Sequence, residues 1–367
     1  MAVGEGIQNS KFKIQNSKFN SQITGIFFVT REIREVREFS GVVYPFMPSF
    51  FHFQFFDMKH IKTYFRSIAQ VMFQGNVPCG ILFLVGIFWG ASSAGTPAVA
   101  WGAVVGTAVS ILTGYLLGYP HNDGEQGLWG FNGVFVGCAL MTFLGSTPLG
   151  WAALVVCSAM TTWVRTALNR LGEPLGVSSY TFPFVMSTWI FLAAARMLGG
   201  IDVVALSHPM LPASFVHLTH SAAPTFIEFV EWTLRGISQV FLIDSWITGV
   251  LFLAGLLIAS PLSALWAVIG SAGGAALALL FGAPTEAIAH GMYGFSPTLT
   301  AIALGAIFLR PSFRTIIWAL VGIVGTFFVQ ASMNVLLAPV GLPSLTAPFC
   351  IATWLFILPT FKNQLKN

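Results

Sequence analysis

Long apolar stretches alternate with short polar connections from Met58 almost to the C-terminal end of the chain. Apolar runs of this length, with glycine and proline but few charges, are typical of helices that cross a membrane. We predict ten such spans, five in each half of the chain. They are Val77–Ala94, Ala98–Gly118, Leu128–Leu144, Leu149–Leu168 and Thr181–Leu198 in the first half, and Trp246–Ala259, Leu262–Phe281, Ala287–Leu309, Thr315–Leu336 and Ser344–Pro359 in the second.

The composition supports a membrane protein. Of the 367 residues, 55% are hydrophobic and 8% are charged, and the mean hydropathy is +0.78. A soluble domain carries about 25% charged residues. A single core in water could not hide this much apolar surface, so we predict an all-α polytopic membrane protein. The four cysteines lie in or beside apolar runs without a CxxC pair, which indicates buried free thiols and neither a disulfide framework nor a metal cluster.

Three segments occur twice, in the same order and at nearly the same separation. Ser67–Phe88 resembles Gly236–Leu257, Gly118–Leu140 resembles Gly282–Leu304, and Ser178–Phe191 resembles Pro343–Phe356. An internal repeat of this kind is typical of transporters and channels. Because each copy holds an odd number of spans, the second copy must enter the membrane from the opposite side. The pattern therefore predicts two inverted repeats related by a pseudo-twofold axis in the membrane plane.

A short segment precedes the first span of each copy, around Gln70 and around Gln239, and is too short to cross a membrane alone. A polar glutamine at the same place in both copies favours a re-entrant pore helix that ends at mid-membrane, where irregular backbone must be shielded by protein or water. The alternative is an amphipathic helix on the membrane surface.

Positive charges are unequally distributed between the two predicted sides. With Met58 in the cytoplasm, only Arg196 and Arg235 fall away from that side. The residues on the cytoplasmic side are Lys59, Lys62, Arg66, Arg165, Arg170, Arg310, Arg314, Lys362 and Lys366. The positive-inside rule therefore predicts that both termini are cytoplasmic. The net charge of +4 forms no patch, so nucleic acid is not an expected partner.

The first 57 residues differ from the rest of the chain. Ile7–Lys13 and Ile14–Asn20 are a tandem duplication without apolar periodicity. We interpret 1–57 as a disordered extension or as sequence upstream of a true translation start at Met58. The predicted division is then repeat A at 58–198, an external connection at 199–225, repeat B at 226–361 and a C-terminal tail at 362–367.

Several motifs resemble those of the urea transporter family. They are Gln70–Val71 and Gln239–Val240, the stretch Gly127–Val134, and Gly341–Phe349. Within the last, Leu342–Phe349 reads the family's LPxxTxPF signature in full, whereas Val177–Phe184 keeps the Thr, Pro and Phe positions and lacks Leu-Pro. The resemblance covers about Met58 to Thr360 and points to a bacterial-type urea channel in the cell inner membrane.

The resemblance implies a homotrimer in a lipid bilayer, in which each protomer encloses its own pore. Transport would be passive, without ATP, a coupled ion, a cofactor or a metal. Amide oxygens of Gln70 and Gln239 would lie at the ends of a row of acceptors, with the hydroxyls of Thr181 and Thr346 at the narrow middle. The pore walls, which act as the selectivity filter, would come from Phe73, Phe131, Phe135, Leu242, Phe295 and Leu299.

These residue types suit urea, which is flat and uncharged, with one carbonyl acceptor and four N–H donors. Leaving such polar groups unpaired in an apolar medium costs about 2–7 kcal/mol each, so a pore must replace the hydrogen bonds of water. Glutamine oxygens, free carbonyls at helix ends and threonine hydroxyls can do so. Phe131 and Phe135 are four residues apart, as are Phe295 and Leu299, which places each pair on one helix face.

Other functions remain open at this stage. Short-chain amides share the planar shape of urea and are the nearest alternative; ammonia would favour paired histidines, which the spans lack. A membrane enzyme would need a nucleophile with its base or clustered acids and histidines, and no HExxH, GxSxG or P-loop occurs. With no Asp or Glu expected at the constriction, ions should be rejected.

Overall fold

The computed structural model describes residues 58–212 and 223–360, and throughout these residues the regular secondary structure is helical. No strand occurs in them, although Leu144 and Val203 form an isolated antiparallel bridge. The prediction of an all-α protein is therefore confirmed for this part of the chain. The predicted extension at 1–57, the C-terminal tail at 362–367 and part of the predicted connection at 199–225 lie outside the described residues.

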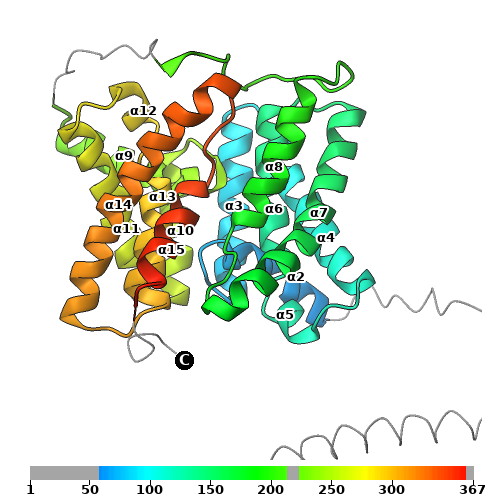
Figure 1. Cartoon of the computed structure of the whole chain (residues 1–367), viewed down its shortest axis with the longest axis horizontal. Coiled ribbons are helices and arrows are strands. Elements are labelled where there is room, and N and C mark those ends of the chain that lie inside the picture. The colour runs from blue at the N-terminus through cyan, green and yellow to red at the C-terminus, as the bar shows by residue number, and fades with distance from the viewer. Residues whose placement is uncertain (1–57, 213–222, 361–367) are drawn as a thin grey trace, which may run out of the picture. The chain divides into compact units, whose positions relative to one another are not determined.

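Two series of helices follow one another along the chain (Figure 1). The first comprises α2 (Met58–Gln70), α3 (Val77–Ser93), α4 (Pro97–Leu116), α5 (His121–Glu125), α6 (Phe131–Phe143), α7 (Pro148–Gly172), the 3-10 turn η1 (Glu173–Leu175) and α8 (Phe182–Ala195). The second comprises α9 (Phe226–Ser238), η3 (Gln239–Phe241), α10 (Trp246–Ala259), α11 (Pro261–Leu280), α12 (Thr285–Ala289), α13 (Phe295–Ile302), the π-helical turn η4 (Ala303–Ile307), α14 (Phe313–Leu337), η5 (Ala338–Val340) and α15 (Ala347–Ile357).

Helix starts are determined by local sequence. The side chains of Asn76, Thr147, Ser245 and Ser312 each accept a hydrogen bond from a backbone N–H in the first turn of the helix that follows. Such N-caps satisfy donors that the helix itself leaves unpaired. Proline in the first turn of α3, α4, α7 and α11 also favours a helix start, because it has no backbone N–H that would be left unpaired there.

The two segments predicted to be too short to cross a membrane are helices that end in a sharp break. With 13 residues each, α2 and α9 are about 20 Å long, against about 30 Å of hydrocarbon. After the last turn the chain passes through a left-handed residue, Phe73 (φ 63°) or Leu242 (φ 59°). The segment Phe226–Phe241 is bent by 75° relative to α10.

Close backbone contact between α4 and α6 depends on glycine. A Cβ on Gly137 would lie 2.0 Å from the carbonyl oxygen of Gly102, and one on Gly106 would lie 2.2 Å from that of Gly133. In a membrane, where the hydrophobic effect does not drive helices together, small residues four apart let two helix backbones approach closely. Gly270 of α11 similarly approaches α13, since an added Cβ would lie 2.6 Å from a carbonyl oxygen of that helix.

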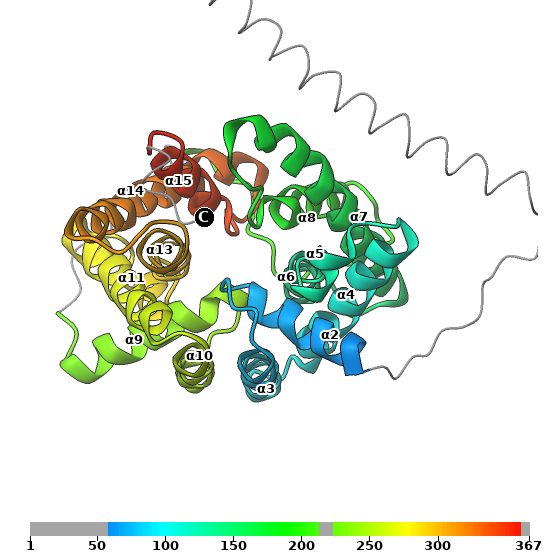
Figure 2. The same ribbon diagram turned by 90° about the horizontal axis from the view of Figure 1, so that it is seen from below.

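The two series of helices meet along α3 and α10, which lie side by side in Figure 2. The Thr248 hydroxyl of α10 donates to the Gly86 carbonyl of α3 at 2.9 Å. The rings of Phe83 and Phe252 pack with centroids 4.9 Å apart, and both side chains are fully buried. The main cluster of buried apolar residues takes in helices of both series and is continuous across this contact.

Four helical segments of the described residues are long and apolar enough to cross a membrane: Pro97–Leu116, Pro148–Leu175, Pro261–Leu280 and Phe313–Val340. The bent pair of α9 with α10 adds a fifth. The other predicted spans contain shorter apolar helices, so the count of ten stays a prediction. The stretch predicted as one span, Ala287–Leu309, is divided, because the chain turns between α12 and α13 through Gly291 (φ 72°).

Candidate functional site

The starts of α8 and α15 meet at Thr181 and Thr346. Their hydroxyl oxygens are 2.6 Å apart and hydrogen-bonded, and each residue is only 2% exposed. Both are N-caps whose side chains make no capping bond, so the hydroxyls remain available to each other. The structure therefore brings together the two threonines expected from the sequence at a narrow middle.

The residues before these threonines are held in an unusual backbone conformation. Tyr180 has φ 48° and Leu345 has φ 49°, and together with Phe73 and Leu242 they make two matched pairs of left-handed non-glycine residues. A bulky side chain in this region costs about 1–3 kcal/mol and persists only where the surrounding structure requires it. All four residues line the cavities described next, so the strain is concentrated at one site.

Each threonine lines a different cavity. The Gln70 cavity, about 250 Å³, includes Gln70, Arg165 and Thr181 in its lining, and the Gln239 cavity, about 240 Å³, includes Gln239 and Thr346. Since a water molecule takes up about 30 Å³ in the liquid, each cavity has room for a small polar solute.

Both helix series contribute to each cavity. Ile307 and Phe308, from the second series, line the Gln70 cavity, while Phe143 and Phe184, from the first series, line the Gln239 cavity. The two cavities are therefore formed at the interface between the two series.

Gln70 and Gln239 lie at the ends of the short helices, one in each cavity. The Nε2 of Gln70 donates to the Gln126 carbonyl and that of Gln239 to the His290 carbonyl, both at 2.9 Å. A carbonyl can only accept, so the amine edge of each amide must face it. The Oε1 of each glutamine is then on the opposite edge, as an acceptor.

The predicted wall residues divide into two groups. Phe73 and Phe131 line the Gln70 cavity, and Leu242 and Phe295 line the Gln239 cavity. Phe135 and Leu299 are fully buried and belong to neither lining. The ring of Phe135 instead stacks on that of Phe184, with centroids 4.8 Å apart.

Polar residues of α7 and α14, which sequence analysis did not select, also line the cavities. In the Gln239 cavity, Ser344 and Asn334 are hydrogen-bonded at 2.9 Å. In the Gln70 cavity, the backbone N–H of Ser179 donates to Asn169 Oδ1 at 2.8 Å. An asparagine at the same place near the end of α7 and of α14 was the signal that could have identified them.

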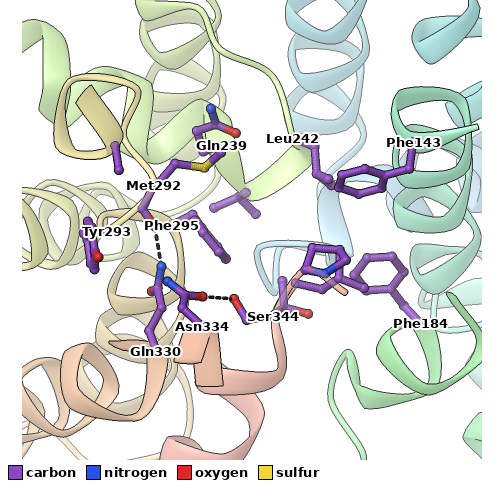
Figure 3. A pocket seen from close by; sticks show the side chains of 15 residues that line it. Phe143, Phe184, Gln239, Leu242, Met292, Tyr293, Phe295, Gln330, Asn334 and Ser344 are labelled. Carbon is purple, nitrogen blue, oxygen red and sulfur yellow. Dashed lines mark hydrogen bonds between the residues drawn. The ribbon is translucent and has the colours of Figure 1, made fainter. Parts of the chain in front are cut away.

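Figure 3 shows the two sides of the Gln239 cavity. Gln330 and Asn334 lie on one side, while Phe143 and Phe184 lie on the other. Nε2 of Gln330 donates to the Met292 carbonyl. Polar groups that can form hydrogen bonds thus face flat apolar rings across the cavity.

Charged residues at and near the cavities pair with one another. Arg165 on the wall of the Gln70 cavity pairs with Asp123 at 3.0 Å. Asp244 accepts from Arg235 at 3.1 Å and is 2.5 Å from His290 Nδ1. Within the described ranges, no group of three or more His, Cys, Asp or Glu could hold a metal ion.

Comparisons with known proteins agree on one family. Residues 61–361 match the model of the urea transporter family. Urea transporter 1 of Ovis aries is 33% identical over 309 residues, which are 83% of this chain and 78% of that protein, and the protein of the same name from Capra hircus gives the same values. Urea transporter 1 of Mus musculus is 33% identical over 301 residues, or 81% of this chain and 76% of that protein.

Proposed function

Because this chain belongs to the urea transporter family and transports urea across a membrane, we propose that urea passes through the Gln70 cavity, the Thr181–Thr346 pair and the Gln239 cavity in turn. The chain is a transporter and not an enzyme. The observation that carries the proposal is the bonded threonine pair, with one hydroxyl in the lining of each cavity.

The residues of the proposed path can replace the hydrogen bonds that urea loses on leaving water. Oε1 of Gln70 or Gln239 accepts an N–H of urea as it enters from either side, because the amine edge of each amide is already occupied. The carbonyls of Gln70 and Gln239 accept the N–H groups of Phe73 and Leu242, and the second lone pair of each carbonyl oxygen would continue the row of acceptors. The apolar faces of urea pass against Phe73 and Phe131 in one cavity, and against Leu242 and Phe295 in the other.

At the middle of the path, urea exchanges hydrogen bonds with the two threonines. Separating Thr181 from Thr346 breaks one hydroxyl–hydroxyl bond, and a urea molecule between them forms a bond with each. A threonine hydroxyl can accept from an N–H and can donate to a carbonyl, so it serves urea in either orientation. The exchange keeps the barrier low without any coupled energy source, which supports passive, channel-like transport.

The linings also support selectivity for small neutral amides. The residues lining the Gln239 cavity include no Asp, Glu, Lys or Arg, and the cation of Arg165 in the Gln70 cavity is paired with Asp123. An ion entering the apolar Gln239 cavity would lose hydration without meeting an opposite charge, which is very costly. Phe135 and Leu299 lie in neither lining and would support the walls from behind, as the ring of Phe135 does by stacking on Phe184.

We further propose that α2–α8 and α9–α15 are two inverted repeats, each with a re-entrant pore helix and five transmembrane helices. Matched features support it: the two short helices, the breaks at Phe73 and Leu242, and the bonded pair Thr181 and Thr346. Both termini would be cytoplasmic, in a homotrimer. The bacterial inner membrane stays a prediction, since the relatives named above are mammalian proteins.

Urea entry into liposomes tests the passive channel. The protein is reconstituted and subjected to an inward urea gradient, and the volume change is followed by stopped-flow light scattering with empty liposomes beside it. We expect fast entry that is unchanged when sodium and proton gradients are removed. Entry that requires either gradient would contradict passive transport.

A further inference from the structure

The wall of the Gln70 cavity that α7 forms carries hydrogen-bond donors. Arg165 and Asn169, one turn apart on α7, both line this cavity. Residues at this spacing share one face of a helix. Away from the threonine pair, Gln70 is an acceptor for the N–H groups of urea, and the carbonyl oxygen of urea still needs a donor in this cavity. The α7 wall can supply that group.

The Arg165 side chain is positioned by one carboxylate and keeps other donors. Its Nη1 donates to Asp123 Oδ2 at 3.0 Å, and the two side chains are 11% and 34% exposed. A guanidinium carries five N–H donors in a planar fork. A single bond to Asp123 therefore fixes the side chain at the cavity and leaves donors for a second acceptor.

Asn169 has its amide orientation set by the backbone. The N–H of Ser179 donates to Asn169 Oδ1 at 2.8 Å. An N–H cannot accept, so the oxygen must face Ser179, and the Nδ2 amine is on the other edge of the amide. The lining of the Gln70 cavity thus combines two donor side chains, Arg165 and Asn169, with the acceptor Oε1 of Gln70.

The matching position of the other series has no cation. Gln330 occupies the place in α14 that Arg165 occupies in α7, and Ala287 stands where α5 has Asp123. One donor of the uncharged Gln330 amide is bonded to the Met292 carbonyl. The two cavities are therefore chemically unequal, and a charged donor faces only the Gln70 cavity among those two linings.

We propose that Arg165, with Asn169, binds the carbonyl oxygen of urea in the Gln70 cavity and makes this cavity the more selective of the two for a strong carbonyl acceptor. The inference rests on the proposed path through this cavity. Urea offers its oxygen to Arg165 and Asn169 and its N–H groups to Gln70.

The test replaces Arg165 and Asp123 by the residues that stand at the matching positions of the other series. The double variant Arg165→Gln/Asp123→Ala removes the cation without leaving an unpaired carboxylate, and Arg165→Lys keeps a cation with fewer donors. Reconstituted proteins are compared for urea and thiourea entry by stopped-flow light scattering, and folding is checked by gel filtration and thermal unfolding. Thiourea serves as the probe because sulfur is a weaker acceptor than oxygen.

We expect the double variant to raise the half-saturating urea concentration about fivefold, the value of one lost hydrogen bond, and to lower the preference for urea over thiourea. Arg165→Lys should give an intermediate result. A folded double variant with unchanged urea kinetics and an unchanged urea-to-thiourea ratio would overturn the proposal. The Arg165–Asp123 pair would then only hold α5 and α7 together. Failure of the path itself is distinguishable, because it would also leave Thr346→Val without effect.

Discussion

Replacing Thr346 by valine removes one hydroxyl at the middle of the proposed path and keeps a side chain of similar shape. The hydroxyl of Thr181 loses its 2.6 Å bond and retains the 3.2 Å contact with the sulfur of Cys350. A urea molecule passing this point then forms a hydrogen bond with one threonine in place of two. The variant has no threonine–threonine bond to break, so the net number of bonds is the same, but one polar group of urea now faces valine and has a weaker partner or none, which costs at least as much as one net hydrogen bond. A net hydrogen bond is worth about 1 kcal/mol, and about 1.4 kcal/mol in a barrier changes a rate tenfold.

We therefore expect urea permeability to fall about fivefold in Thr346→Val. If the passing N–H group found no partner at all, the cost of about 1–3 kcal/mol would correspond to as much as about a hundredfold. The double variant Thr181→Val/Thr346→Val should approach this limit. Stopped-flow light scattering of proteoliposomes at matched protein content measures both effects.

Thr353 of α15 provides a matched control. It is fully buried on the same helix, and its hydroxyl has no hydrogen-bond partner among the described residues. It also belongs to neither cavity lining, so Thr353→Val should leave urea permeability unchanged. Wild-type urea entry in folded Thr346→Val would refute the reasoning, because the hydroxyl would then not contact the solute at the rate-limiting point.

Two other changes test the acceptors and the packing. In Gln239→Met, the Gln239 cavity loses an acceptor. Urea permeability should then fall about fivefold in the same assay, and water permeability should not change. A parallel fall of urea and water permeability would indicate general disruption of the protein. In Gly137→Ala, the new Cβ would lie 2.0 Å from the Gly102 carbonyl oxygen, and we expect a loss of about 1–3 kcal/mol in stability. Thermal unfolding in detergent measures this loss of stability. The control is Gly199→Ala, because a Cβ added at Gly199 would have nothing within 4 Å. Equal unfolding midpoints for the two variants would contradict close packing of α4 on α6.

The sequence predicted the main features of the fold because membrane helices have a strong compositional signal. The predicted start of α3 and the predicted bounds of α10 agree with the structure. The place of Thr181 and Thr346 at the middle was implied by the resemblance to the urea transporter family, which the repeated TxPF pattern carries, and the two hydroxyls are bonded. The helix bounds are local in sequence, so a single chain is enough to reveal them, whereas the threonine pair needed the resemblance.

Other features depend on how distant segments pack. Nothing in the residue type of Phe73 or Leu242 favours a positive φ, which arises because the chain must turn sharply between a short helix and the next one. The division of the predicted span Ala287–Leu309 was missed because mean hydropathy does not detect a turn at a glycine. Arg165 was interpreted as a cytoplasmic charge, and only the folded arrangement places it at a cavity wall.

The most direct test of the account is to locate a urea analogue in the protein. Crystals soaked in selenourea would be measured at the selenium absorption edge, so that anomalous scattering marks the solute. We expect selenium sites in the Gln70 cavity and the Gln239 cavity, one on each side of Thr181 and Thr346. Selenium sites confined to the outer surface of the helices, with both cavities free of anomalous signal at saturating selenourea, would contradict the proposed path.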